Sequence, residues 1–203
     1  MLSLTEKILF VLATLASLYF TYKGAQRIIG HISSGQGKPN WNLVWKRIGD
    51  LILKVGLFQP VFRFRLWPSI LHALIGWGFL SFLLINLADL IYAYTNFKLL
   101  EHLGLFGDAY RLLADVANVA ILVGMVAMII RRFLLRPATL STRESTLLHP
   151  KARFGILRDS AIVGSFILLH VGGRFVGETF RVAAAGKDSW QPFASAVAGL
   201  WAG

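Results

Sequence analysis

The sequence predicts an all-α integral membrane protein, a helical bundle with four transmembrane helices. Three observations lead to this fold class. The 203 residues are 56% hydrophobic and only 15% charged, whereas a soluble domain of this size carries about a quarter charged residues. The mean hydropathy of the chain is +0.61. Four segments are also long and apolar enough to cross a bilayer, which takes roughly 20 residues per helix.

The four predicted spans are separated by polar loops. They are Ile8–Ile29, Pro68–Thr95, Tyr110–Ile130 and Asp159–Phe175. The last span is the shortest. No small-residue cleavage site closes the first apolar run, so we expect it to be retained as a helix and not removed as a signal peptide.

Basic residues are distributed very unevenly between the spans. Of the 21 Lys and Arg residues, eight lie in 23–65 and seven in 131–158, but only one lies in 96–109. By the positive-inside rule, the first two loops face the cytoplasm and the N-terminus lies outside. We therefore expect a multi-pass protein of the cell inner (cytoplasmic) membrane, in contact with the lipid bilayer. Topology explains most of the net charge of +11, so nucleic acid is not an expected partner.

Two shorter segments have the pattern of helices outside the hydrocarbon. In the first basic loop, Asn40 is a suitable N-cap, and apolar residues recur at helical spacing from Trp41 to Val55. We interpret this segment as a helix in the cytoplasmic interface, with docking of a soluble partner as the alternative. The segment Trp190–Trp201, with Pro192 in its first turn, predicts a second interfacial helix.

A histidine lies inside the second span, about one turn from its start. An ionisable group within the hydrocarbon is a functional hypothesis by default. Gly76 follows His72 on the same helical face and leaves room for a planar macrocycle to approach the backbone. We therefore interpret His72 as an axial ligand of a b-type haem. The alternative is a buried histidine that is hydrogen-bonded to a neighbouring helix.

A second histidine lies in the fourth span, and His170, Arg174 and Glu178 share one face of that helix. The functional interpretation makes His170 another haem ligand and Arg174 a neutralising partner for haem propionates. The alternative is an Arg174–Glu178 pair at the end of the helix, with His170 bonded to a neighbour. Asp89 and Asp115 could line a quinone or proton site. The alternative for these acids is local capping or pairing, for instance with Arg111.

The chain contains no cysteine. This excludes a disulfide framework, a thiolate metal site, covalent c-type haem attachment and an iron–sulfur cluster held within these residues.

The order of these features resembles the gamma subunit of respiratory nitrate reductase, the membrane di-haem cytochrome b of that enzyme. The run from Leu71 to Gly76 opens the second span, where the family places a haem-binding histidine near the cytoplasmic face. The stretch from Arg131 to Pro137, followed by a Ser/Thr-rich segment, is similar to the family's link between its third and fourth helices.

A closer likeness is to the N-terminal membrane region of fused Fe–S oxidoreductases that are similar to heterodisulfide reductase subunits. There, Arg63-Phe-Arg65 and the run from His72 to Phe79 have counterparts. The segment Trp190-Gln-Pro-Phe-Ala-Ser-Ala is similar to the one just before their fifth helix.

The sequence departs from this family pattern in two places. The nitrate reductase pattern has a second histidine ten residues after the first, but Phe82 stands there. An outer haem would then need another ligand, such as His170. The family's fifth helix, with further histidines, is also missing. We therefore expect 1–203 to be one membrane domain, the N-terminal part of a longer protein with a fifth helix and a cytoplasmic Fe–S domain, or one whose fifth helix comes from another polypeptide.

The depths of the two histidines also bear on haem binding. At 1.5 Å of rise per residue, His72 lies ~7 Å and His170 ~18 Å from the cytoplasmic ends of their predicted helices. This mismatch predicts one haem near each face, each completed by a ligand from outside these residues.

The expected function is that of a cytochrome-b-like oxidoreductase component of a respiratory chain. It would carry electrons between the menaquinone or ubiquinone pool and a cytoplasmic Fe–S protein or domain, through one or two haem b groups. The alternative is a haem-free membrane anchor or scaffold for a cytoplasmic partner.

Overall fold

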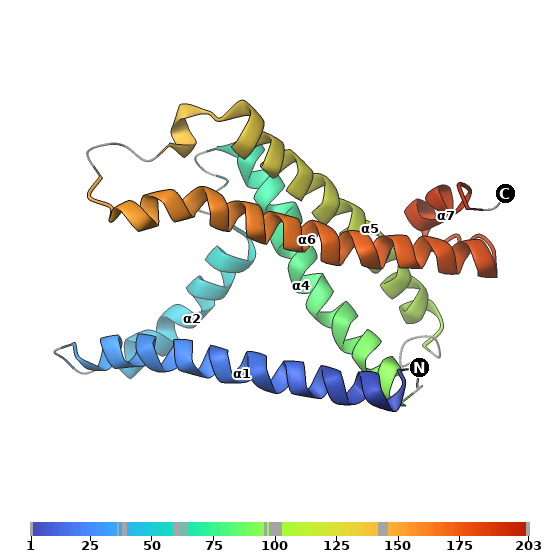
Figure 1. Cartoon of the computed structure of the whole chain (residues 1–203), viewed down its shortest axis with the longest axis horizontal. Helices are drawn as coiled ribbons and strands as arrows, with labels where there is room; N and C mark the ends of the chain where they lie inside the picture. The colour runs from blue at the N-terminus through green and yellow to red at the C-terminus, as the bar shows by residue number, and fades with distance from the viewer. Residues whose placement is uncertain are drawn as a thin grey trace.

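The computed structural model describes residues 2–35, 37, 40–58, 62, 65–95, 97, 103–141 and 146–201, and these residues are almost entirely helical. Figure 1 shows the helices in chain order. They are α1 (Leu4–Ser33), α2 (Trp41–Gly56), α4 (Leu66–Thr95), α5 (Leu105–Ile129), a π-helical continuation (Ile130–Leu135), a 3₁₀ turn (Ala138–Leu140), α6 (Pro150–Ala185) and α7 (Pro192–Ala198). The predicted all-α fold class is confirmed for the described residues.

Four helices are long and apolar enough to cross a membrane, as the sequence predicts: α1, α4, α6, and α5 with its π-helical extension. The sequence-based bounds of α6 are wrong, however. This helix has 36 residues and is the longest of the four, where the shortest was expected. It begins early because His149 caps it and Pro150 occupies its first turn, a position that suits proline. Both features lie in a polar stretch without apolar periodicity.

The core of the bundle lies between α4, α5 and α6. Its largest cluster of buried side chains comprises Phe82, Ile85, Ala114, Ile121, Met125, Ile167 and Val171. Glycines allow the helices to approach closely: a Cβ on Gly78 would overlap Ile121, and one on Gly164 would lie 3.1 Å from Ile129. By contrast, no atom comes within 4 Å of a Cβ built on Gly173 or Gly177. Gly173 and Gly177, spaced by four residues on α6, therefore do not mark a close helix contact among the described residues.

Helices α1 and α2 lie at the side of this core, and neither has a buried residue among those described. The N-terminal end of α1 meets the C-terminal end of α4, where Lys7 Nζ donates to the Tyr94 carbonyl and the Tyr94 hydroxyl to the Lys7 carbonyl, both at 3.2 Å (Figure 1). Asn40 caps α2 by accepting a hydrogen bond from the Leu43 amide, so the predicted helix start is confirmed.

Connectivity and contacts place the ends of the helices in two groups. The start of α1, the end of α4 and the start of α5 lie at one end of the bundle, together with α7, which packs on the C-terminal part of α6. The end of α1, the start of α4, the π-helical end of α5 and the start of α6, which carry the described basic residues of these stretches, lie at the other end. The outside location of the N-terminus stays a prediction.

Candidate functional site

His72 projects from the first third of α4, and its side chain is exposed. Its Nδ1 lies 2.8 Å from the carbonyl oxygen of Pro68, one turn earlier in the same helix. A carbonyl can only accept, so Nδ1 carries the proton and the lone pair of the neutral ring is on Nε2. The alternative of a buried histidine bonded to a neighbouring helix does not describe this residue. His72 presents a ligand nitrogen away from its own helix.

Gly76 lies one turn beyond His72, and an aromatic ring covers it. A Cβ on Gly76 would overlap the ring of Phe58, which follows the end of α2. Trp77, the next residue, also contacts the end of α2. Its Nε1 donates to the Gly56 carbonyl at 2.6 Å, and its ring meets that of Phe58 edge-on with centroids 6.2 Å apart. The surface expected to receive a macrocycle is therefore packed against the end of α2 in this structure.

His170 lies on α6 among aromatic side chains. Its exposed ring is parallel to that of Phe166, with centroids 6.0 Å apart, and meets the ring of Phe82 edge-on at 6.1 Å. The Arg174 guanidinium lies over the same Phe82 ring, 5.8 Å from its centre. The structure thus places two predicted site residues, His170 and Arg174, beside Phe82.

The two histidines lie at different levels of the bundle. His170 contacts Phe82, which follows His72 by ten residues on α4, or about 15 Å of helical rise. A single cofactor that both side chains would bind directly is therefore not favoured by this separation. The structure agrees with the depth difference expected from the sequence.

Arg174 has a different partner from the one considered from sequence. Its guanidinium binds Asp89 of α4 with both carboxylate oxygens, at 2.9 and 3.3 Å. Glu178 does not pair with Arg174 but binds Arg181 on its own helix and the side chain of Gln191. The alternative interpretation from the sequence, an Arg174–Glu178 pair, is therefore wrong, because Arg174 binds Asp89 of α4 instead. A propionate would have to share Arg174 with this carboxylate.

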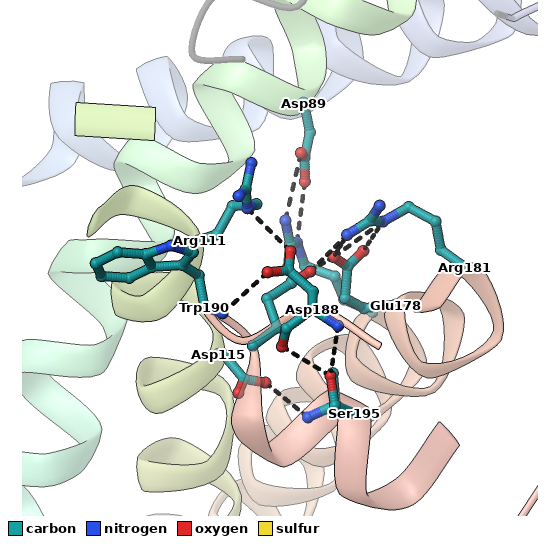
Figure 2. Close-up of polar contacts among 11 residues, drawn as sticks. Asp89, Arg111, Asp115, Glu178, Arg181, Asp188, Trp190 and Ser195 are labelled. Carbon is teal, nitrogen blue, oxygen red and sulfur yellow. Dashed lines mark hydrogen bonds and ion pairs between the residues drawn. The ribbon is translucent and has the colours of Figure 1, made fainter. Parts of the chain in front are cut away.

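A second group of polar residues fixes α7 at this end of the bundle (Figure 2). We call it the α7 network, and it comprises Arg111, Asp115, Glu178, Arg181, Asp188, Gln191 and Ser195. Asp115 is buried on α5, and its two carboxylate oxygens accept hydrogen bonds from the backbone amides of Phe193 (2.7 Å) and Ala194 (3.0 Å). These amides belong to the first turn of α7, which has no partner for them within the helix. Asp115 thus caps α7 from a neighbouring helix.

Arg111 joins the loop before α7 to the start of α5. Its guanidinium binds Asp108 at 2.7 Å and Asp188 at 3.0 Å. Of the alternatives given for Asp115, pairing with Arg111 is not found, because Arg111 binds Asp108 and Asp188, whereas a capping role is found, on α7. Sequence reasoning missed Asp188 and Gln191. The motif Asp188-Ser-Trp-Gln-Pro could have indicated this turn, since an Asp shortly before a helix that starts with Pro is typical of a turn that precedes a cap.

The chemistry open to these groups follows from their pairing. Within the described residues, no cluster of three or more His, Asp or Glu side chains could hold a metal ion. Asp89 and Asp115 are both engaged by donors, which suits a structural role. The side chains of His72 and His170 are both exposed. Arg63, one of the residues that carry the family resemblance, lies outside the described residues.

No family model matches the chain, and neither a curated protein nor a solved structure matches it.

Proposed function

We propose that the protein is a membrane electron-transfer component of the cytochrome b type, in which His72 is an axial ligand of haem b. The observation that carries this proposal is the Pro68 carbonyl on Nδ1 of His72 at 2.8 Å. A hydrogen bond at this ring nitrogen fixes the tautomer and the orientation of an imidazole ligand and increases its basicity. In this chain the hydrogen bond is made by an exposed histidine within an apolar span.

The residues near His72 set the conditions for such a cofactor. Haem supplies one-electron chemistry, and the protein controls it through the axial ligand, burial and nearby charge. Gly76 provides a surface without a side chain, but the Phe58 ring must leave that surface for a macrocycle to lie against it. Displacement of the α2 end is therefore part of this proposal.

A second haem at the level of Phe82 would use His170, with Arg174 near its propionates. The support is that His170 and Arg174 both contact Phe82, at the position where the resembling family has a histidine. The remaining axial ligands would come from a fifth helix. Electrons would pass between menaquinone or ubiquinone and a cytoplasmic Fe–S protein or domain, as the resemblance implies.

The test is a reduced-minus-oxidised spectrum of the full-length protein in membranes. We expect a b-type band, and we expect His72→Ala to lose the haem nearer the basic loops while the protein still inserts. His149→Ala is the matched control, because His149 is exposed and caps α6 outside the apolar region. Equal haem content in wild type and His72→Ala would remove this residue from the site.

The second candidate function is a haem-free membrane anchor that recruits a cytoplasmic partner. The packing of Phe58 on Gly76 favours it, because that packing closes the surface beside His72 without any cofactor. An anchor shows no b-type band in the same spectrum, so one measurement separates the two functions.

A further inference from the structure

A cavity of about 330 Å³ lies where α5 passes through its π-helical end and turns back into α6. Three arginines, Arg132, Arg136 and Arg153, and three aliphatic side chains, Leu140, Ile156 and Leu157, contribute to its lining. We call this cavity the arginine pocket. It lies within the basic stretch 131–158, at the opposite end of the bundle from the α7 network.

The backbone at this turn has an unusual form that shapes the pocket. The helix continues for six residues with π-helical bonding, and Arg136 then takes a left-handed conformation with φ of +42°. Pro137 follows and prevents the helix from continuing. Short π-helical segments are frequent at functional sites, and this one places Arg132 and Arg136 on the wall of a single cavity.

The arginines of the pocket have no acidic partner among the described residues. Arg136 Nε donates to the Phe133 carbonyl at 2.8 Å, and Arg153 donates to the Thr146 carbonyl at 3.1 Å. Arg132 is half-buried, and its Nε is fully buried with no hydrogen-bond partner. An unpaired donor on a buried charged group is costly. The buried Nε of Arg132 and the lack of acidic partners for these described arginines favour an anion in the pocket.

The shape of the pocket favours a phosphate that carries hydrocarbon chains. The guanidinium fork binds phosphate oxygens in pairs. The aliphatic side of the pocket, with Leu140, Ile156 and Leu157, lies where apolar spans end and the polar loop begins. Basic pockets between helices at the cytoplasmic side of a membrane bind the head groups of anionic lipids.

We propose that the arginine pocket is a specific site for the head group of an anionic phospholipid, such as phosphatidylglycerol. Its phosphate lies between Arg132 and Arg153, and its chains follow the aliphatic wall into the bilayer. This site is separate from the histidines and does not depend on the proposed haem.

The experiment uses the full chain in nanodiscs that contain phosphatidylcholine and phosphatidylglycerol, with native mass spectrometry of the lipids that remain bound. We expect wild type to retain phosphatidylglycerol well above its share of the bilayer. Arg132→Gln and Arg153→Gln should each reduce this enrichment about tenfold, as expected for the loss of one charge-assisted hydrogen bond. Arg153 is exposed at the rim, so its variant serves if Arg132→Gln does not insert.

The matched control is Arg158→Gln, which removes the same charge from the same helix. Arg158 is exposed, pairs with Asp159 at 3.4 Å and does not line the pocket. We expect this variant to retain phosphatidylglycerol as wild type does. An equal loss in Arg158→Gln and Arg153→Gln would show general attraction to the loop and overturn the proposal.

A second arm adds excess inorganic phosphate to the loaded nanodiscs. We expect the lipid to stay, because its chains add apolar contacts that free phosphate lacks. Displacement by phosphate would assign the pocket to a soluble phosphate compound and overturn the lipid assignment.

Discussion

The two ends of the bundle formed by α4, α5 and α6 carry their charges in different ways. At the α7 end, five carboxylates and three arginines are joined by ion pairs or backbone bonds, and the acids are Asp89, Asp108, Asp115, Glu178 and Asp188. At the other end, Arg132, Arg136 and Arg153 have no ion pair among the described residues. Charge therefore serves to join helices at the first end, and it is left available for a ligand at the second.

The difference has a structural cause. Helix α7 is only seven residues long, and a helix this short is not stable by itself. Its two buried alanines, Ala194 and Ala198, supply little apolar area. Polar bonds must therefore supply much of what holds it. At the opposite end, α5 continues into its π-helical end, a 3₁₀ turn (Ala138–Leu140) follows, and α6 begins at Pro150.

The largest expected effect is the loss of the cap on α7. Asp115→Ala removes both acceptors from two amides in a buried position, which should cost about 2–4 kcal/mol of stability. We expect fast hydrogen exchange across 192–198 and a lower unfolding temperature. Asp159→Ala, at an exposed acid paired with Arg158, is the control. Unchanged exchange in α7 would contradict the capping role.

An intermediate effect is expected from Glu178→Gln. The carboxylate receives bonds from Arg181 and Gln191, and its side chain is 20% exposed. Because Arg181 is half-exposed and water screens this pair, the loss should be about 1 kcal/mol. The measurement is the thermal unfolding midpoint, together with hydrogen exchange in 186–191. Asp50→Asn, in an exposed pair on α2, should show no such change.

The smallest effect on stability is expected at the opposite end. In bilayers of zwitterionic lipid, Arg132→Gln should not lower stability, because no acidic partner is lost and a buried unpaired donor is removed. Added phosphatidylglycerol should raise the unfolding temperature of wild type but not of the variant, since a ligand stabilises only the state that binds it. A large loss in zwitterionic lipid would mean that this arginine holds the fold together, as those at the α7 end do.

The sequence was sufficient for features that depend on local composition. The apolar runs gave four spans, and Asn40 gave the start of α2, because hydropathy and N-capping act over a few residues. The basic start of α6 was missed because its first two turns have no apolar periodicity. Its cap and its first-turn proline were present in the sequence.

Partners that come from distant parts of the chain could not be predicted. Asp115 lies 78 residues before the amide of Phe193, and Arg174 lies 85 residues after Asp89. Spacing along one helix suggested Arg174 with Glu178, but α4 and α6 both pack on α5, and Arg174 binds Asp89 of α4 instead. Whether the surface at Gly76 is open or covered likewise depends on the position of Phe58 after α2. The residues next to Gly76 in the sequence do not indicate that position.

The origin of the α7 cap also bears on the order in which this membrane protein matures. The carboxylate of Asp115 enters the bilayer with α5, but its two amide donors are synthesised only after α6 has followed. Until then, this acid must be solvated by water or kept near the membrane surface, since apolar surroundings offer it no donor. The hydrogen bonds of Asp115 on α5 can therefore form only after residues 193 and 194 have been translated, because these residues supply the two amide donors.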